Sequence, residues 1–308
     1  YMKKVLVTGG VGFLGTHIIK RLLKFKYHII VLDHPSQKKN IKIKNKLITY
    51  FWCDLLNEKE LKKIKLNNVS SVLHLAAQAS GPRSFYIPNK DININILGTL
   101  NLIKLCVRLK IKHIIFASSF VICGDADKEK INENTEPRPN SVYANSKLAA
   151  ENLLKIYAAP NGIKWNILRM FNVYGKGQDL NSTDQGIVGI FAGMMMRTKK
   201  IIVKGSLDRF RDLINISDVV DAWMLCLKKK KFNETYNVGT GKKTTIKNLI
   251  YSIAQVLEKK DIIIEEIKNT KGDLMGSYAD LSKIKKDLGF RPKVELKNGL
   301  KEMLIDNK

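Results

Sequence analysis

The first half of the chain alternates short apolar runs with longer stretches in which apolar residues recur every three or four positions. Short runs rich in β-branched residues predict strands, and the longer periodic stretches predict helices. We expect strands at Lys4–Thr8, His28–Asp33, Ile48–Asp54, Ser71–Ala77, His113–Ser119 and Trp165–Phe171. We expect helices at Thr16–Phe25, Asp91–Arg108 and Ser141–Tyr157. This alternation is typical of an α/β fold with a doubly wound parallel sheet and helices on both faces.

After about Asn172 the pattern becomes irregular, with loops rich in Gly, Asn and Asp. It contains one strand-like run, Glu234–Val238, and helical patterns at Ser217–Leu227 and Thr245–Leu257. We therefore expect a smaller lobe, partly interleaved with the sheet, over the carboxyl ends of the strands. The expected division gives residues 1–171 to a nucleotide-binding domain, to which 211–240 return, and residues 172–210 and 241–308 to a substrate-binding lobe.

Composition agrees with a globular protein, since the chain of 308 residues is 44% hydrophobic and 27% charged. No apolar run reaches the roughly 20 residues that span a bilayer. The strand pattern begins by Lys4, unlike a signal or transit peptide, so we expect a cytoplasmic protein with no membrane partner. Four cysteines without C-x-x-C spacing lead us to expect buried reduced thiols and no metal site: Cys53, Cys106, Cys123 and Cys226.

The formal net charge of +26 raises the question of a nucleic-acid partner. Nucleic-acid-binding proteins favour arginine, whose forked guanidinium donates paired hydrogen bonds to bases and phosphates. Arginine supplies only nine of the 54 basic residues here. The lysines are scattered over expected helix faces and loops. We therefore expect a solvated basic surface and no nucleic-acid partner.

A glycine-rich turn, Thr8-Gly9-Gly10-Val11-Gly12-Phe13-Leu14-Gly15, follows the first expected strand and opens the first expected helix. Glycines permit a tight turn, let the backbone approach a pyrophosphate and bring the helix close to the strand. The helix N-terminus offers free N–H groups to phosphates. In this context the motif predicts a dinucleotide on a Rossmann fold. The residues expected at the cofactor are Gly9, Gly12, Phe13, Leu14 and Gly15.

Asp33 ends the second expected strand, eighteen residues after Gly15. A carboxylate there accepts hydrogen bonds from the adenosine ribose and repels a 2′-phosphate, which favours NAD over NADP. The alternative is that Asp33 caps a helix. Lys38 and Lys39 follow closely and would soften the selectivity, but we expect NAD as the cofactor.

Ser119 ends the fifth expected strand, and Tyr143 and Lys147 stand four positions apart at the start of an expected helix. Positions i and i+4 share one helix face, so Lys147 lies beside Tyr143. The ammonium, together with a positive nicotinamide, would bring the tyrosine pKa from about 10 toward neutrality. Tyr143 would then take a hydroxyl proton while hydride leaves the same carbon, with Ser119 holding the oxygen. A Tyr–Lys pair on a helix surface is common, and only the preceding motifs make it a catalytic candidate.

With these motifs the chain resembles the extended short-chain dehydrogenase/reductases, specifically the nucleotide-sugar epimerase and dehydratase group. The resemblance runs from Lys4 to about Leu304. It is carried by Thr8–Gly15, Asp54-Leu55, His74–Gln78, Asn95–Thr99, Tyr143–Lys147, Leu168–Gly175, Arg211-Asp212, Tyr236–Gly241 and Leu288–Pro292.

For the cofactor, the resemblance implies that Asp54 and Leu55 flank the adenine and that Ala76 and Ala77 line the nicotinamide side. Lys147 would also bind the nicotinamide ribose.

For the substrate, the resemblance implies that Asn172 and Arg211 hold the diphosphate of a nucleotide sugar and that Asp273 lies near the nucleotide ribose. Asn95 would support the active-site helix. The chain departs from the family in having Thr270 where an arginine often contacts the diphosphate, and Cys123 where a tyrosine is usual. We expect Cys123 to serve in packing, with an acid role as the alternative.

The residues after the catalytic serine separate the reactions of this group. The resembling 4,6-dehydratases carry an Asp-Glu pair there, because loss of water needs a further acid and base. Here the residues are Phe120 and Val121. We therefore expect a UDP-hexose 4-epimerase that passes through a transient 4-keto sugar and regenerates NAD. An NAD(P)H-dependent reductase of a 4-keto sugar stays open, as do a non-catalytic dinucleotide-binding protein and a basic nucleic-acid-binding protein.

In the resembling epimerases, the residue four positions after the Gly-Asp aspartate gates the space beside C2 of the sugar. That residue is Ser277, whose small side chain would admit an N-acetyl group, although it could simply be a small residue in a strand. The resemblance also implies a homodimer built from the helices at Asp91–Arg108 and Ser141–Tyr157. Its apolar contacts would come from Leu100, Ile103, Leu148 and Leu153, unless these residues pack onto the sheet.

Overall fold

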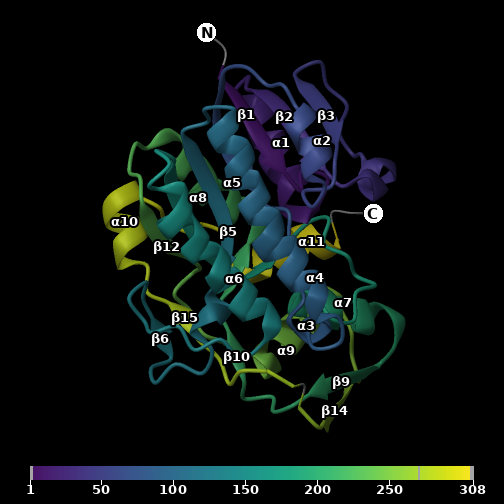
Figure 1. The fold of residues 1–308 in the computed structure, drawn as a ribbon. Helices are drawn as coiled ribbons and strands as arrows, with labels where there is room; N and C mark the ends of the chain where they lie inside the picture. Colours follow the sequence, from purple (N-terminus) through teal and green to yellow (C-terminus); the bar gives the residue numbers. More distant parts are fainter. Residues whose placement is uncertain (1–2, 270, 306–308) are drawn as a thin grey trace.

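The computed structural model describes residues 3–269 and 271–305 and is built around one seven-stranded parallel sheet (Figure 1). The strand order is β12-β7-β5-β4-β1-β2-β3. The strands are β1 (Lys4–Thr8), β2 (His28–Asp33), β3 (Ile48–Trp52), β4 (Val69–His74), β5 (His113–Ser119), β7 (Lys164–Met170) and β12 (Glu234–Val238). The order reverses between β1 and β4, which is where doubly wound sheets bind ligands beyond the carboxyl ends of their strands. The α/β doubly wound fold expected from the sequence is confirmed.

Helices cover both faces of the sheet because alternate strand residues point to opposite sides. One buried cluster contains Val5 and Val7 with residues of α1 (Phe13–Lys24), α8 (Ile216–Lys228) and α10 (Ser282–Leu288). The other contains Leu6 with residues of α2 (Glu58–Lys63), α5 (Gly98–Arg108) and α6 (Val142–Leu153). The sheet is therefore buried on both sides, as its continuous apolar strands require.

Two helices expected as single segments change geometry along their length. The expected helix Asp91–Arg108 begins as the π-helical η2 (Asp91–Leu97) before α5, and Ser141–Tyr157 becomes α6 followed by the π-helical η4 (Leu154–Ala158). Shorter helical segments precede or connect these elements: η1 (Pro35–Asn40), α3 (Gly81–Ser84), α4 (Pro88–Lys90) and η3 (Phe120–Cys123).

A third buried cluster lies in the second half of the chain, among α7 (Ile187–Arg197), α9 (Ile246–Val256) and α11 (Leu296–Leu304). Four two-stranded pairs accompany it: β8 (Asn172–Tyr174) with β11 (Leu213–Asn215), β9 (Lys200–Lys204) with β14 (Ile263–Ile267), β10 (Phe210–Arg211) with β13 (Thr244–Thr245), and β6 (Lys130–Ile131) with β15 (Tyr278–Ala279). The expected division into two domains stays a prediction. Strand β12, from the segment expected to return to the first domain, lies in the main sheet. Leu274, Ile284 and Phe290 belong to the expected lobe but pack in the buried cluster of α1 and α8.

The four cysteines are buried and unpaired by disulfides. Across residues 3–269 and 271–305, no helix has the length and apolar character needed to cross a bilayer. Within the same ranges, no three His, Cys, Asp or Glu side chains are arranged to hold a metal ion.

Candidate functional site

The glycine-rich turn leaves backbone exposed where a side chain would not fit. Gly9 has a φ of +67°, and a Cβ on it would lie 2.8 Å from the Ala76 nitrogen. A Cβ on Gly15 would lie 2.4 Å from the Gly9 carbonyl oxygen. Gly12 is the N-cap of α1 and brings no capping side chain, so the first N–H groups of the helix are left to a ligand. This cradle of bare backbone fits a dinucleotide pyrophosphate.

Asp33 turns its carboxylate toward this cradle. One oxygen accepts from the Val11 N–H at 3.1 Å, and the other accepts from the His34 N–H at 2.9 Å. Burial raises the pKa of Asp33, while both hydrogen bonds act to lower it. The helical turn that follows is capped by His34, so helix capping does not explain Asp33.

The remaining residues expected at the adenine and the nicotinamide lie in the segments that follow β3 and β4. Asp54 is half-buried, and its carboxylate accepts from the Leu56 N–H at 2.9 Å. On the other side, the Thr8 hydroxyl accepts from the Ala76 N–H at 3.2 Å. This bond fixes the segment of Ala76 and Ala77 beside the end of β1. Leu55 is buried at 9% exposure, and Phe13 and Leu14 open α1.

The expected catalytic residues meet where β5 ends against α6. Ser141 caps the helix, its hydroxyl accepting from the Ala144 N–H at 3.1 Å. Tyr143, two residues further along, is hydrogen-bonded to Ser119. The Lys147 ammonium donates to the Ala117 carbonyl at 2.9 Å and lies 6.0 Å from the centre of the Tyr143 ring.

Burial dominates the ionisation of this group. It raises the pKa of Tyr143 to about 12; the Ser119 hydrogen bond opposes this rise and the charge of Asp91 adds to it. Burial lowers the pKa of Lys147 to about 8, against the charges of Asp91 and Glu151. The expectation that Lys147 and a positive nicotinamide together bring the Tyr143 pKa toward neutrality stays a prediction, because in the protein by itself burial dominates.

Asn95 joins the loop after β4 to the catalytic helix. Its amide accepts from the Gln78 N–H at 2.9 Å and donates to the Ser146 hydroxyl at 2.9 Å. Gln78 in turn donates to both carboxylate oxygens of Asp91, at 3.0 and 2.9 Å. Asn95 thus contacts the active-site helix directly, in keeping with a supporting role.

On the substrate side, two expected residues bind each other. Arg211 donates to the Asp273 carboxylate at 2.6 Å and to the Phe210 and Leu274 carbonyls at 2.7 and 3.1 Å. Arg209 forms a second ion pair with Asp273. Both arginines are buried, so one carboxylate is shared by two guanidinium groups.

The other expected substrate residues are separate from this cluster. The amide oxygen of Asn172, at the start of β8, is buried and has no hydrogen-bond partner among the described residues. Such an orphaned acceptor fits a site that a ligand completes. Ser277 precedes β15 and is buried at 3% exposure.

Of the two positions at which the chain departs from the family it resembles, one lies among the described residues. Thr270 lies outside the described residues. Cys123 is 1% exposed, and burial raises the pKa of its thiol to about 11, which agrees with packing and disfavours an acid role. Phe120 is also buried and stacks on Phe171 with ring centres 4.6 Å apart. The position after Ser119 thus holds an aromatic contact.

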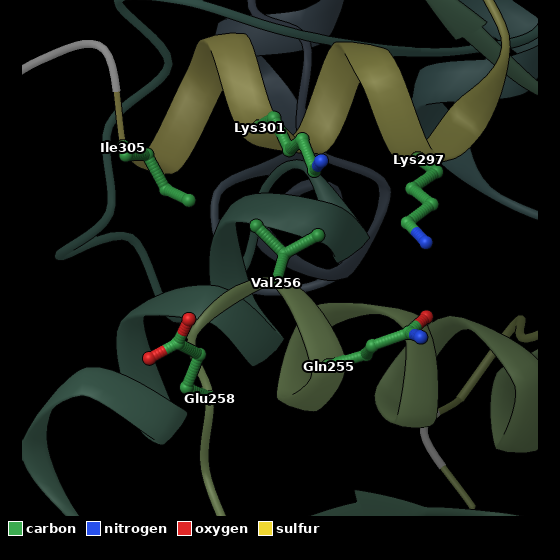
Figure 2. A pocket seen from close by; sticks show the side chains of 6 residues that line it. All are labelled: Gln255, Val256, Glu258, Lys297, Lys301 and Ile305. Carbon is green, nitrogen blue, oxygen red and sulfur yellow. The ribbon is translucent and has the colours of Figure 1, made fainter.

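A separate cavity of about 340 Å³ opens between α9 and α11 (Figure 2). Its walls come from Gln255, Val256, Glu258, Lys297, Lys301 and Ile305. None of these is an expected site residue.

The sequence reasoning missed three charged residues that border the site: Asp91, Glu151 and Arg209. Glu151 follows Tyr143 by two steps of four residues, and Arg209 stands two positions before Arg211, directly before β10. Helical and strand periodicity could therefore have indicated both.

The comparisons with known proteins agree with this geometry. Residues 5–239 match the model of the NAD dependent epimerase/dehydratase family. A putative UDP-glucose 4-epimerase of Methanocaldococcus jannaschii is 33% identical over 303 residues, which cover 97% of each chain.

Two solved structures share the fold over nearly the whole chain. The UDP-glucose 4-epimerase of Thermotoga maritima, with UDP-glucose, is 33% identical with a TM-score of 0.89 and covers 98% of this chain and 97% of its own. The UDP-N-acetylglucosamine 4-epimerase of Methanobrevibacter ruminantium, in complex with UDP-N-acetylmuramic acid, is 30% identical with the same TM-score and coverage. The relatives also include a dTDP-4-dehydro-6-deoxyglucose reductase of Escherichia coli at 29% identity, so similarity alone does not separate the reactions. The chain belongs to the NAD-dependent epimerase/dehydratase family, as its motifs indicated.

Proposed function

We propose that this protein is an NAD-dependent UDP-hexose 4-epimerase, which inverts C4 of the sugar through a transient 4-keto intermediate. The observation that carries the proposal is the meeting of Ser119, Tyr143 and Lys147 at the end of β5, with buried Phe120 next to them. This set can oxidise and reduce one carbon. It lacks, after Ser119, the further acid and base that dehydration needs.

The cofactor would lie on the glycine cradle, with its adenosine ribose at Asp33 and its nicotinamide ribose at Lys147. Bound there, NAD supplies reversible hydride transfer with C4 of the sugar. Because burial raises the pKa of Tyr143 to about 12, its phenolate form needs positive charge close by. Lys147 and the nicotinamide cation would together supply that charge.

In this mechanism the phenolate oxygen of Tyr143 takes the proton of the C4 hydroxyl as hydrogen leaves C4 with its electron pair. The C4–O bond becomes a carbonyl, and the Ser119 hydroxyl donates a hydrogen bond to its oxygen. After the sugar turns over, the bound cofactor would supply hydride to the opposite face of C4, and Tyr143 would give its proton back to the C4 oxygen. No net cofactor is consumed, so the reaction is an isomerisation.

The direct test is to incubate the purified protein with UDP-galactose and follow UDP-glucose by chromatography, without added reductant. Conversion to an equilibrium mixture from either sugar supports the proposal. The reductase alternative instead predicts stoichiometric NADH or NADPH consumption with a 4-keto sugar nucleotide. If neither sugar is converted while a 4-keto sugar is reduced, the epimerase proposal is wrong.

We also propose a homodimer. Ile103, expected in its contacts, is fully buried against the sheet, so it does not contribute. Other apolar residues of the same helices are exposed, namely Leu97 at 40% and Ile156 at 70%. Exposed apolar residues on paired helices suit a subunit interface. Light scattering at micromolar concentration tests this, since a monomeric mass would contradict it.

A further inference from the structure

A row of polar side chains crosses the apolar sheet one residue before the end of β5. Ser118 of β5 lies opposite Arg169 of β7, and Arg169 lies opposite Asn237 of β12. Their exposed fractions are 2%, 4% and 1%. On the same strands, Phe116 and Ile167 point to the same face and belong to its hydrophobic cluster. The row is therefore a polar interruption of that face, directly beneath α6.

Glu151 of α6 joins this row. Arg169 donates from Nε to Glu151 Oε1 at 3.0 Å and from Nη2 to Oε2 at 2.8 Å. Ser118 donates to Oε1 at 2.6 Å. Arg169 Nη1 donates to the Glu133 carbonyl at 3.0 Å. Glu151 is fully buried, so its carboxylate is paired in two-point geometry and sealed from water.

Glu151 stands on the catalytic face of α6. Tyr143, Lys147 and Glu151 follow one another at four-residue steps, so they share one side of the helix. Their partners are three consecutive residues of β5: Tyr143 bonds Ser119, Lys147 bonds the Ala117 carbonyl, and Glu151 bonds Ser118. The Glu151–Ser118 hydrogen bond is thus a third contact between α6 and β5, and the ion pair with Arg169 extends it to β7.

Stability alone does not account for such a pair. Taking a carboxylate and a guanidinium out of water costs several kcal/mol per ion, and apolar residues of similar volume often stabilise a core equally well. What the pair adds is a fixed direction and distance between two elements, because a two-point ion pair tolerates little sliding.

We propose that Glu151, held by Arg169 and Ser118, is a positioning residue that sets α6 against β5 and so fixes Tyr143 and Lys147 at the reacting carbon. The inference rests on the proposed oxidation and reduction at Tyr143, and not on which sugar is bound.

The same carboxylate acts on Lys147 through its charge. The charged and titratable groups around Lys147 are Asp91 from η2, His74 from β4, and Tyr143 and Glu151 from α6. Burial, with the charge of Lys147, lowers the pKa of His74 to about 3, so His74 is neutral. The negative charges that support the Lys147 ammonium are thus those of Asp91 and Glu151.

The test compares Glu151→Gln with a matched control, Asp218→Asn. Asp218 is also a buried helix carboxylate, but it accepts from the Lys293 and Val294 N–H groups, away from α6. We expect Glu151→Gln to lower kcat by about 10- to 100-fold with little change in KM, because misplacement of about 1 Å costs this much. Asp218→Asn should lose thermal stability without this change in kcat.

A second readout needs no substrate. The protein is labelled with ¹³C at the lysine Cε, and the Lys147 signal is identified by its absence in Lys147→Arg. In Glu151→Gln the pKa of Lys147 should fall below that of the unmodified protein. If UDP-hexoses are not converted by any variant, the proposed function fails, while this titration still reports on Glu151. An unchanged Lys147 pKa together with an unchanged kcat would overturn the positioning role.

The double variant Glu151→Leu with Arg169→Met separates positioning from stability. We expect a folded protein with a Tm close to that of the unmodified chain and a kcat that stays low. A stable double variant with full kcat would also overturn the proposal. If the double variant does not fold, the pair is needed for stability, and the two readouts on Glu151→Gln decide the matter.

Discussion

The two charged clusters of the site are balanced differently. Beside the catalytic helix, one arginine, Arg169, meets one carboxylate, Glu151, in a two-point pair. On the substrate side, Asp273 is shared by two buried arginines, Arg209 and Arg211. Burial and the charge of Arg209 lower the pKa of Arg211 to about 10, and Glu266 partly offsets the charge at Arg209. In the first cluster one carboxylate faces one arginine, whereas in the second two buried arginines share the Asp273 carboxylate. For the proposed function, this difference predicts catalytic groups that are fixed within the protein and substrate groups that the ligand completes.

The largest effect should come from the side of the catalytic helix, at Tyr143. Replacing Tyr143 by Phe removes the proton path and should lower kcat by about 10²–10⁴. Its hydrogen bond with Ser119 is lost, but the ring and the Lys147–Ala117 bond stay. The measurement is kcat for UDP-galactose, with circular dichroism as the control for folding. Normal turnover by the Phe variant would show that Tyr143 is not catalytic.

Removing Arg211 from the cluster around Asp273 should weaken substrate binding. In Arg211→Met, Asp273 and Arg209 become a one-to-one pair, and the diphosphate of the proposed substrate would lose a charge-assisted hydrogen-bond donor. We expect KM for the UDP-sugar to rise about 10- to 100-fold, since such bonds contribute about 1.5–3 kcal/mol. Steady-state kinetics distinguishes the two sides, because a fall in kcat at constant KM would contradict the comparison.

The pH dependence of kcat should report the ionisation of Lys147, which shares a helix face with Glu151. Burial lowers the pKa of Lys147 to about 8, so its ammonium is present below pH 8 and is lost as the pH rises through that value. We expect kcat to fall about tenfold for each pH unit above about 8, as the group that supports the Tyr143 phenolate loses its charge. A pH profile that stays flat to pH 10 would mean that the ammonium is not required.

The smallest expected change concerns the choice of sugar. Ser277 is small and buried near the end of the segment that carries Asp273. Ser277→Tyr should lower kcat/KM for UDP-N-acetylglucosamine about tenfold relative to UDP-glucose, because a packed site tolerates little added volume. The ratio of the two kcat/KM values is the readout. An unchanged ratio would remove Ser277 from the sugar site and leave the plain packing role.

Elements of the first half could be predicted because their patterns are local. The strands expected at His28–Asp33 and His113–Ser119 have the observed bounds. The first helix begins at Phe13, three residues before the expected start, because Gly12 rather than the first apolar periodic residue caps it. Boundaries depend on which backbone group is left unpaired, and a hydrophobic pattern does not show that.

The second half was harder to predict for a physical reason. Helix α7 has the sequence IVGIFAGMMMR, which is apolar on nearly every side, so it lacks the two-faced pattern of a surface helix. Strands β9 and β14 pair in parallel although more than 50 residues separate them, and β10 and β13 have two residues each. Such short, distant pairings carry little signal in the sequence.

The sequence by itself determined the parallel sheet, the glycine cradle with Asp33, and the Tyr143–Lys147 spacing, because each depends on the chain within a few turns or strands. Only the tertiary structure placed Ser118 opposite Arg169 and both beneath Glu151, since strand register and helix docking join residues from separate elements. It also decided that Asp273 is shared by Arg209 and Arg211, some 60 residues away. The burial of Tyr143, which raises its pKa, was decided there too, because it depends on how α6 packs against the sheet.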